Sequence, residues 1–173
     1  MKKRKKRIAE KPEKKTGLIK QKKARVLSTL TGLGEQLYQQ MAHREFPWIK
    51  MPNRSIYNIH YDTNLRQYIL GDRSVKRSSR NIKHIRPLTQ LVWTASFVNE
   101  LRGQDRTSTL RDVFYSAQAY EMCFADQTES DNIITDLETV IGHSREDFNV
   151  FPEERSAIFG NLVVEYTVRG YEG

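Results

Sequence analysis

Apolar side chains recur at the spacing of a helix over residues 21–44, in the N-terminal part of the chain. Gly32 and Gly34 interrupt this pattern, and each costs up to about 1 kcal/mol relative to alanine inside a helix. We therefore expect a kink or two consecutive helices in a helical extension at 16–45. The single apolar stripe of this segment needs a covering surface, from the rest of the chain or from another subunit.

Trp48 begins a region in which apolar and polar residues alternate, as is typical of strands. Three short runs at 48–51, 56–61 and 67–70 are separated by residues that favour turns. They predict a small β-meander. Together with the polar segment that follows, the meander forms a predicted unit at 46–86.

Helical spacing returns in the last predicted unit, 87–173. Pro87 suits the first turn of a helix, a second helix is predicted at 109–122, and a third is predicted after 126–130, with Gly142 as its stop. A β-hairpin follows at 157–166. Three helices followed by a hairpin is the order of a winged-helix domain. The sequence thus predicts an α+β fold with a helical N-terminal extension, a β-meander and a winged-helix domain.

The helix at 109–122 carries the candidate chemistry. Thr109 can act as its N-cap, with Asp112 at the third helical position. Arg111 and Tyr115 lie four residues apart and therefore share a face of the helix. Because a guanidinium favours both a phenolate and a phosphate, Tyr115 is a candidate nucleophile toward a phosphate. The alternative is an ordinary amphipathic helix whose tyrosine is half buried.

Positive charge is concentrated at the N-terminus. Residues 1–25 hold 13 of the 29 lysines and arginines and 2 of the 21 acidic residues, which leaves 16 basic and 19 acidic side chains in the remainder. We expect residues 1–15 to be a disordered basic tail that binds nucleic acid without sequence preference. A tail that serves solubility or localisation is the alternative.

A second basic patch lies in the body of the chain and is opposed only by Asp72. Such a patch can bind phosphates, although a solvated face is the more ordinary explanation of a charge run. Its members are Arg66, Arg73, Lys76, Arg77, Arg80, Lys83 and Arg86.

Several classes of protein are excluded or disfavoured by composition. No apolar run is long enough to span a bilayer, and the lysine-rich N-terminus lacks the apolar stretch of a signal peptide, so we expect a cytoplasmic protein. Cys123 is the only cysteine, which excludes an intrachain disulfide and a zinc cluster of thiolates. The four histidines show no paired spacing, and no metal ligands are expected in this chain.

Three stretches occur together in a specific order. Arg111-Asp112-Val113-Phe114-Tyr115 has an Arg-acidic-X-aromatic-Tyr pattern, the segment 51–72 precedes it, and 144–160 follows it. With these stretches the chain resembles the A subunit of archaeal DNA topoisomerase VI, a type IIB enzyme, and the related eukaryotic protein that makes meiotic double-strand breaks. The similarity covers about 46–166.

The resemblance implies a CAP-like winged helix that carries the nucleophile at Tyr115. Its phenolate would attack a DNA phosphodiester and form a 5′-phosphotyrosyl link, which religation reverses. Since a tyrosine ordinarily has a pKa near 10, its deprotonation needs help, and Arg111 is our candidate for ordering the phosphate. From 126 to 154 Arg145 is the only basic residue against nine acidic ones, so we expect the basic patch, Arg102, Arg106 and the tail to bind DNA.

The resemblance further implies a homodimer that cleaves double-stranded DNA together with an ATP-binding B subunit of the GHKL class, for which 21–44 is the expected contact. Mg²⁺ would be held by a Toprim domain, and the seven residues 167–173 are too few to form one. We therefore expect the isolated chain to cleave DNA weakly or not at all. The assembled complex is expected to be associated with the nucleoid. The alternative is a winged-helix module that binds DNA or a partner protein without chemistry.

Overall fold

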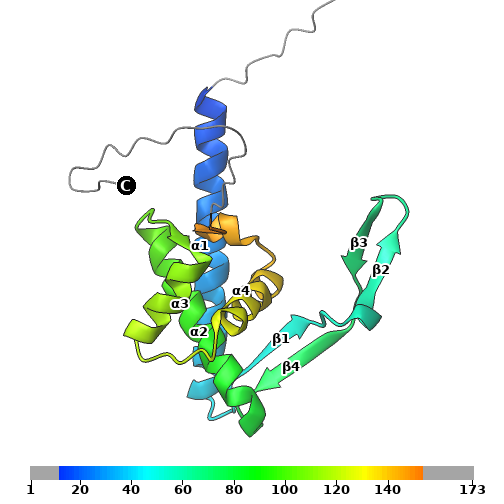
Figure 1. Cartoon of the computed structure of the whole chain (residues 1–173), viewed down its shortest axis with the longest axis vertical. Coiled ribbons are helices and arrows are strands. Elements are labelled where there is room, and N and C mark those ends of the chain that lie inside the picture. The colour runs from blue at the N-terminus through cyan, green and yellow to red at the C-terminus, as the bar shows by residue number, and fades with distance from the viewer. Residues whose placement is uncertain (1–11, 154–173) are drawn as a thin grey trace, which may run out of the picture.

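The computed structural model describes residues 12–153 and the side chains from Lys20 onward. It is a mixed helical and stranded fold, which confirms the predicted α+β class (Figure 1). Among the described helices none is both long and apolar enough to cross a membrane. The elements are α1 (Pro12–Ala42), β1 (Trp48–Pro52), η1 (Ile56–Asn58), β2 (Ile59–Asp62), β3 (Gln67–Leu70), β4 (Ser74–Ser78), α2 (Ile82–Gly103), β5 (Ser108–Thr109), α3 (Leu110–Ala119), α4 (Gln127–Ile141), η2 (Arg145–Phe148) and β6 (Val150–Phe151).

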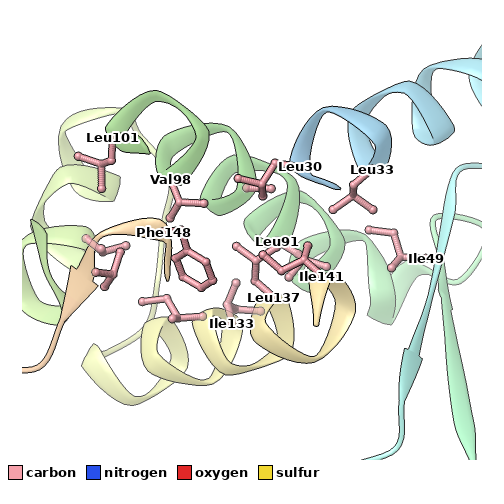
Figure 2. Close-up of a cluster of buried hydrophobic side chains, with 14 of the residues drawn as sticks. Leu30, Leu33, Ile49, Leu91, Val98, Leu101, Ile133, Leu137, Ile141 and Phe148 are labelled. Atoms are coloured by element: carbon pink, nitrogen blue, oxygen red, sulfur yellow. The ribbon is translucent and has the colours of Figure 1, made fainter. Parts of the chain in front are cut away.

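One apolar core joins α1, α2, α4 and η2, and Figure 2 shows Leu30, Leu91, Leu137 and Phe148 converging in it. Phe148 and Leu137 are completely buried. Burying an aliphatic or aromatic side chain of this size contributes about 1.5–3 kcal/mol. The core therefore holds the helix that carries the candidate nucleophile against a rigid support, since Val113 of α3 is part of the same cluster.

The predicted apolar stripe of α1 is covered by the body of the same chain. Val26, Leu30 and Leu33 are buried, whereas Gly32 and Gly34 lie on the exposed side. The helix is continuous from Pro12 to Ala42, so the expected alternative of two consecutive helices is wrong. Burial of the stripe outweighs the two glycines, because each buried side chain contributes more than one glycine costs.

The helix also begins earlier than expected. Residues 12–15, which the sequence places in the disordered tail, are helical, and Pro12 occupies the first helical position that suits proline. Two ion pairs to the body, Lys22–Asp147 and Lys23–Asp105, anchor the helix farther along. Residues 1–11 of the predicted tail lie outside the described residues.

The predicted meander is wrong in its topology. β1 pairs antiparallel with β4, and β2 with β3, so the segment is a hairpin nested inside a hairpin and projects from the helical body as an arm (Figure 1). The sequence pattern does not predict β4, because its sequence Ser-Val-Lys-Arg-Ser is mostly polar. It forms a strand because its partner β1 is apolar on one side, with Ile49 and Met51 buried.

The two halves of the arm meet at Asn58, which is buried. Its Nδ2 donates to the carbonyl oxygens of Asn53 (2.7 Å), Gly71 (3.2 Å) and Arg73 (3.1 Å), and its Oδ1 accepts from the Arg73 amide at 3.1 Å. Gly71 packs so closely that an added Cβ would lie 2.7 Å from Asn58 Oδ1. The bend of the arm is therefore fixed by one amide side chain.

Replacing Gly71 by alanine is expected to destabilise the protein by about 1–3 kcal/mol, because the added methyl group displaces Asn58 from its hydrogen bonds. The melting temperature should fall by roughly 3–8 °C in a thermal melt. Gly103→Ala is the matched control, since an added Cβ there meets no atom within 4 Å. Equal melting temperatures for the two variants would contradict the role of Asn58.

The second helix begins five residues before its predicted start. Asn81 caps it, with Oδ1 accepting from the Lys83 amide at 3.0 Å, so Pro87 lies inside α2 rather than in its first turn. The cap compensates for a proline that cannot donate to the carbonyl of Lys83. α3 ends at Ala119, before the expected Met122, and α4 begins at Gln127, earlier than expected, because the side chain of Asp126 caps it. Gly142 ends α4 in the left-handed conformation (φ 68°), as predicted.

The last described elements end before the hairpin that would form the wing of the winged helix. β5 and β6 form a short parallel pair, with Ser108 opposite Val150. The hairpin predicted at 157–166 lies outside the described residues. Three helices of the predicted winged helix are thus present in order, and the winged-helix assignment itself stays a prediction.

Candidate active site

The start of α3 is fixed by a capping box, as the sequence predicts. Thr109 Oγ1 accepts from the Asp112 amide at 3.1 Å, and Asp112 Oδ2 accepts from the Thr109 amide at 3.2 Å. The preceding residue, Ser108, is held in place because its amide donates to the carbonyl oxygen of Asn149 at 3.0 Å. These bonds fix the direction in which α3 leaves the body and commit the carboxylate of Asp112 to the backbone.

Arg111 and Tyr115 are in direct contact on the outer face of α3. Arg111 donates to the Tyr115 phenolic oxygen from Nε at 3.3 Å and from Nη2 at 3.2 Å. Tyr115 is 50% exposed, and Val113 and Ala117 on the opposite face are buried. The sequence prediction that the cation and the phenol share a face is therefore confirmed.

The hydrogen bond to Tyr115 raises the pKa of Arg111, and the nearby Glu153 carboxylate adds to the effect. Glu153 Oε1 lies 3.7 Å from Arg111 Nη1. The guanidinium consequently stays charged at any physiological pH. It can stabilise an anion at the phenolic oxygen or at a phosphate next to it.

Tyr115 stands between two hollows in the surface. One of about 370 Å³ reaches toward the end of α2 and includes Arg106 and Tyr120 in its wall. The other, of about 560 Å³, is lined on its polar side by Arg111, Gln127 and Glu153. A phosphodiester can therefore approach the phenolic oxygen without displacing any part of the core.

Two of the predicted DNA-binding residues are paired with carboxylates of α4. Arg77 Nη2 lies 2.6 Å from Asp136 Oδ2, and Arg86 Nη2 lies 2.7 Å from Glu129 Oε2. Arg102, for which the sequence predicts the same role, donates to Asn149 Oδ1 at 2.6 Å. The charges of Arg77 and Arg86 are thus compensated within the fold.

The other six predicted residues are exposed and form no ion pair with the part of the chain that the structure describes: Arg66, Arg73, Lys76, Arg80, Lys83 and Arg106. Arg106 lies by the hollow next to Tyr115. The rest belong to the arm, to the segment between the arm and α2, or, for Lys83, to the first turn of α2. The predicted patch is therefore divided between two places on the molecule.

The sequence does not predict one carboxylate that binds two arginines of the arm. Asp136 of α4 is buried and binds Arg54 and Arg77 of the arm together, one with each carboxylate oxygen, both at 2.6 Å. An acidic residue among the buried Ile133, Ile134 and Leu137 is the signal that could have found it.

The magnesium that the resemblance implies has no ligand set here. Among the described residues no three His, Cys, Asp or Glu side chains gather closely enough to hold a metal ion. Asp112 is engaged in the capping box, and Glu129 pairs with Arg86. The residues present do not fit a magnesium site, so no step of the chemistry below is assigned to one.

A sequence model of the family described as type IIB DNA topoisomerase matches residues 86–150, which contain α2, the whole of α3 with Tyr115, and α4. Over these residues the chain is similar to the type IIB DNA topoisomerase family. The predicted resemblance is therefore confirmed.

Curated relatives support the same assignment over a longer stretch. The chain is 38% identical over 139 residues to the A subunit of type 2 DNA topoisomerase 6 from Methanothermobacter thermautotrophicus, covering 80% of this chain and 39% of the relative. The protein of the same name from Halobacterium salinarum is 38% identical over 146 residues (82% and 40%), and that from Pyrococcus abyssi 29% over 161 residues (90% and 41%). The chain thus spans about two fifths of the length of these relatives.

Proposed function

We propose that this chain supplies the DNA-cleaving tyrosine in the A subunit of a type IIB topoisomerase, and that the tyrosine is Tyr115. The observation that carries the proposal is the contact of Arg111 with the phenolic oxygen of the half-exposed Tyr115, inside the stretch that matches the family. A buried tyrosine, or one paired with a carboxylate, would not support it.

The proposed reaction is a transesterification. The Tyr115 oxygen attacks a DNA phosphorus and forms a phosphotyrosyl ester to the 5′ end, the P–O3′ bond breaks, and the 3′ oxygen leaves as a hydroxyl after taking a proton. Religation is the same exchange in reverse. Because one phosphate ester replaces another, cleavage and religation need no external energy source.

Arg111 is proposed to hold the scissile phosphate against Tyr115 and to offset the charge that grows on its oxygens. Arg111→Ala is expected to lower the rate of covalent adduct formation by roughly 10²–10³-fold in the assembled enzyme. Arg111→Lys should recover part of this loss, because a lysine keeps the charge without the two-pronged geometry. Unchanged cleavage by Arg111→Ala would remove the proposed role.

DNA binding beyond the site is proposed for Arg73, Lys76, Arg80, Lys83 and Arg106, which are exposed and without an ion pair in the described chain. Arg77 and Arg86 are proposed as weaker contributors, since their charges are compensated by carboxylates. The acidic surface of α4 should face away from DNA, because cations next to it, Arg86 at Glu129 and Arg145 at Glu138, already have their charges compensated.

The wider assembly is also part of the proposal. We expect a homodimer of A subunits, with Mg²⁺ held by a Toprim domain and ATP bound by a GHKL-type B subunit. The groove between α1 and α2 is the proposed contact for the ATP-binding partner, because Tyr38 and Leu33 line it beside Val92 and Tyr38 is 65% exposed. The winged-helix fold and a place in the nucleoid belong to the same proposal.

The proposal is tested by covalent trapping. The chain is incubated with a Toprim-bearing counterpart, Mg²⁺ and supercoiled DNA, denatured, and examined for protein attached to 5′ DNA ends. Adducts that map to Tyr115 by peptide mass spectrometry are the expected result. If DNA is bound but no adduct forms, the chain is a binding module without chemistry.

A further inference from the structure

The outer face of the β1–β4 ribbon carries two lysines directly opposite each other. In the antiparallel register Lys50 faces Lys76, and both side chains are exposed. Side chains in such pairs have Cβ atoms about 4.5–5.5 Å apart, and like charges at this distance are destabilising. The ribbon therefore keeps an arrangement that its own folding does not favour.

The neighbours of this pair do not compensate it. Within the described residues neither lysine forms an ion pair, and the acidic side chain of the arm nearest in sequence, Asp72, forms none either. Lys76 Nζ lies 3.9 Å from the centre of the Trp48 ring, and this cation–π contact places the ammonium group while leaving its charge intact.

The opposite face of the ribbon is occupied. Ile49 and Met51 are buried there, and Arg77 is bound to Asp136 of α4. Arg54, at the end of β1, is bound to the same carboxylate. Since the inner cations are neutralised and the ribbon is clamped to the helical body, the Lys50–Lys76 pair is presented outward on a rigid base.

We propose that the Lys50–Lys76 pair is a phosphate-binding clamp for the backbone of duplex DNA, separate from the Tyr115 site. A two-stranded ribbon can lie along a DNA groove, and two exposed ammonium groups can each bind a backbone phosphate. Binding of this kind releases counterions and carries no sequence preference. The inference rests on the proposed function only for the choice of DNA as the polyanion.

If the pair is a clamp, removing lysine charge should weaken DNA binding without lowering the stability of the fold. Lys50→Gln/Lys76→Gln should weaken binding of a labelled duplex of about 20 base pairs by roughly 10- to 50-fold at about 0.1 M salt. The slope of log affinity against log salt should fall by about 2, one for each lost phosphate contact. In contrast, Lys50→Gln alone should leave the melting temperature unchanged or raise it by about 1 °C, since it relieves a repulsion.

Two control variants of the whole chain make the test specific. Lys50→Arg/Lys76→Arg keeps the charges and should bind as the unmodified chain does, measured by fluorescence anisotropy. Lys20→Gln/Arg25→Gln removes two exposed charges from α1 and should not change the slope by as much. Binding that is equal for the Lys50→Gln/Lys76→Gln variant and the unmodified chain would overturn the clamp.

Failure of the clamp and failure of the proposed function give different results. If adducts form at Tyr115 while the lysine variant binds normally, the clamp and the DNA-binding role of Lys76 are wrong, and the catalytic proposal stands. If binding depends on the lysine pair while no adduct forms in the assembled enzyme, only the catalytic proposal is wrong. Absence of any binding to duplex DNA by the unmodified chain would overturn the clamp as well.

Discussion

Tyr115→Phe is expected to abolish covalent attachment of the protein to DNA while leaving noncovalent binding within about twofold. The change removes one oxygen atom from a residue that is 50% exposed, so the fold should tolerate it. Among the described residues, the hydrogen bonds lost are those that Arg111 donates to that oxygen, at 3.3 and 3.2 Å. Adducts are measured by trapping in denaturant, and binding by anisotropy.

Tyr120→Phe is the matched control for this experiment. Tyr120 lies just beyond the end of α3, is 66% exposed, and contributes to the same hollow of about 370 Å³, but no hydrogen bond to its hydroxyl is present in the described structure. Its variant should form adducts at the normal rate. Adducts that persist in Tyr115→Phe and vanish in Tyr120→Phe would show that Tyr115 is not the nucleophile.

Asp136→Ala is expected to destabilise the protein by about 3–5 kcal/mol, because it leaves two arginines without their shared carboxylate. The Asp136 side chain is 5% exposed, and those of Arg54 and Arg77 are 32% and 22% exposed, so water replaces the carboxylate poorly. Urea denaturation followed by circular dichroism measures the change in the free energy of unfolding.

The arginines themselves provide the control for Asp136. Arg54→Met should cost less than Asp136→Ala, because Arg77 still neutralises the carboxylate. Combining Arg54→Met with Asp136→Ala should cost less than the sum of the two single changes, since the partners share one interaction. Strictly additive free energies would show that the three side chains do not act as a unit.

The helices of the body are largely predictable from sequence, because each combines an apolar period with a recognisable end. Thr109 and Asp112 indicate the start of α3, and Gly142 indicates the end of α4. The start of α2 is predicted wrongly, because Pro87 indicates a first turn five residues too late. In the structure the helix begins at Ile82, where the side chain of Asn81 caps it.

The arm is less predictable, because its pairing depends on contacts distant in sequence. β1 and β4 are joined across the inserted β2–β3 hairpin, and nothing local to Ser74–Ser78 indicates a strand. The partition of the basic patch is hidden for the same reason, since Arg77 meets Asp136 only after the chain has folded. The contact between Arg111 and Tyr115 needs only helical spacing and is predicted correctly.

In the first turn of α3 the neighbouring charged side chains of Arg111 and Asp112 point in different directions. The short carboxylate of Asp112 turns back to the amide of Thr109, and the long guanidinium of Arg111 extends forward to Tyr115. A proton released by the phenol therefore has no free base on this turn. The acceptor has to come from solvent, from the DNA or from another part of the assembled enzyme.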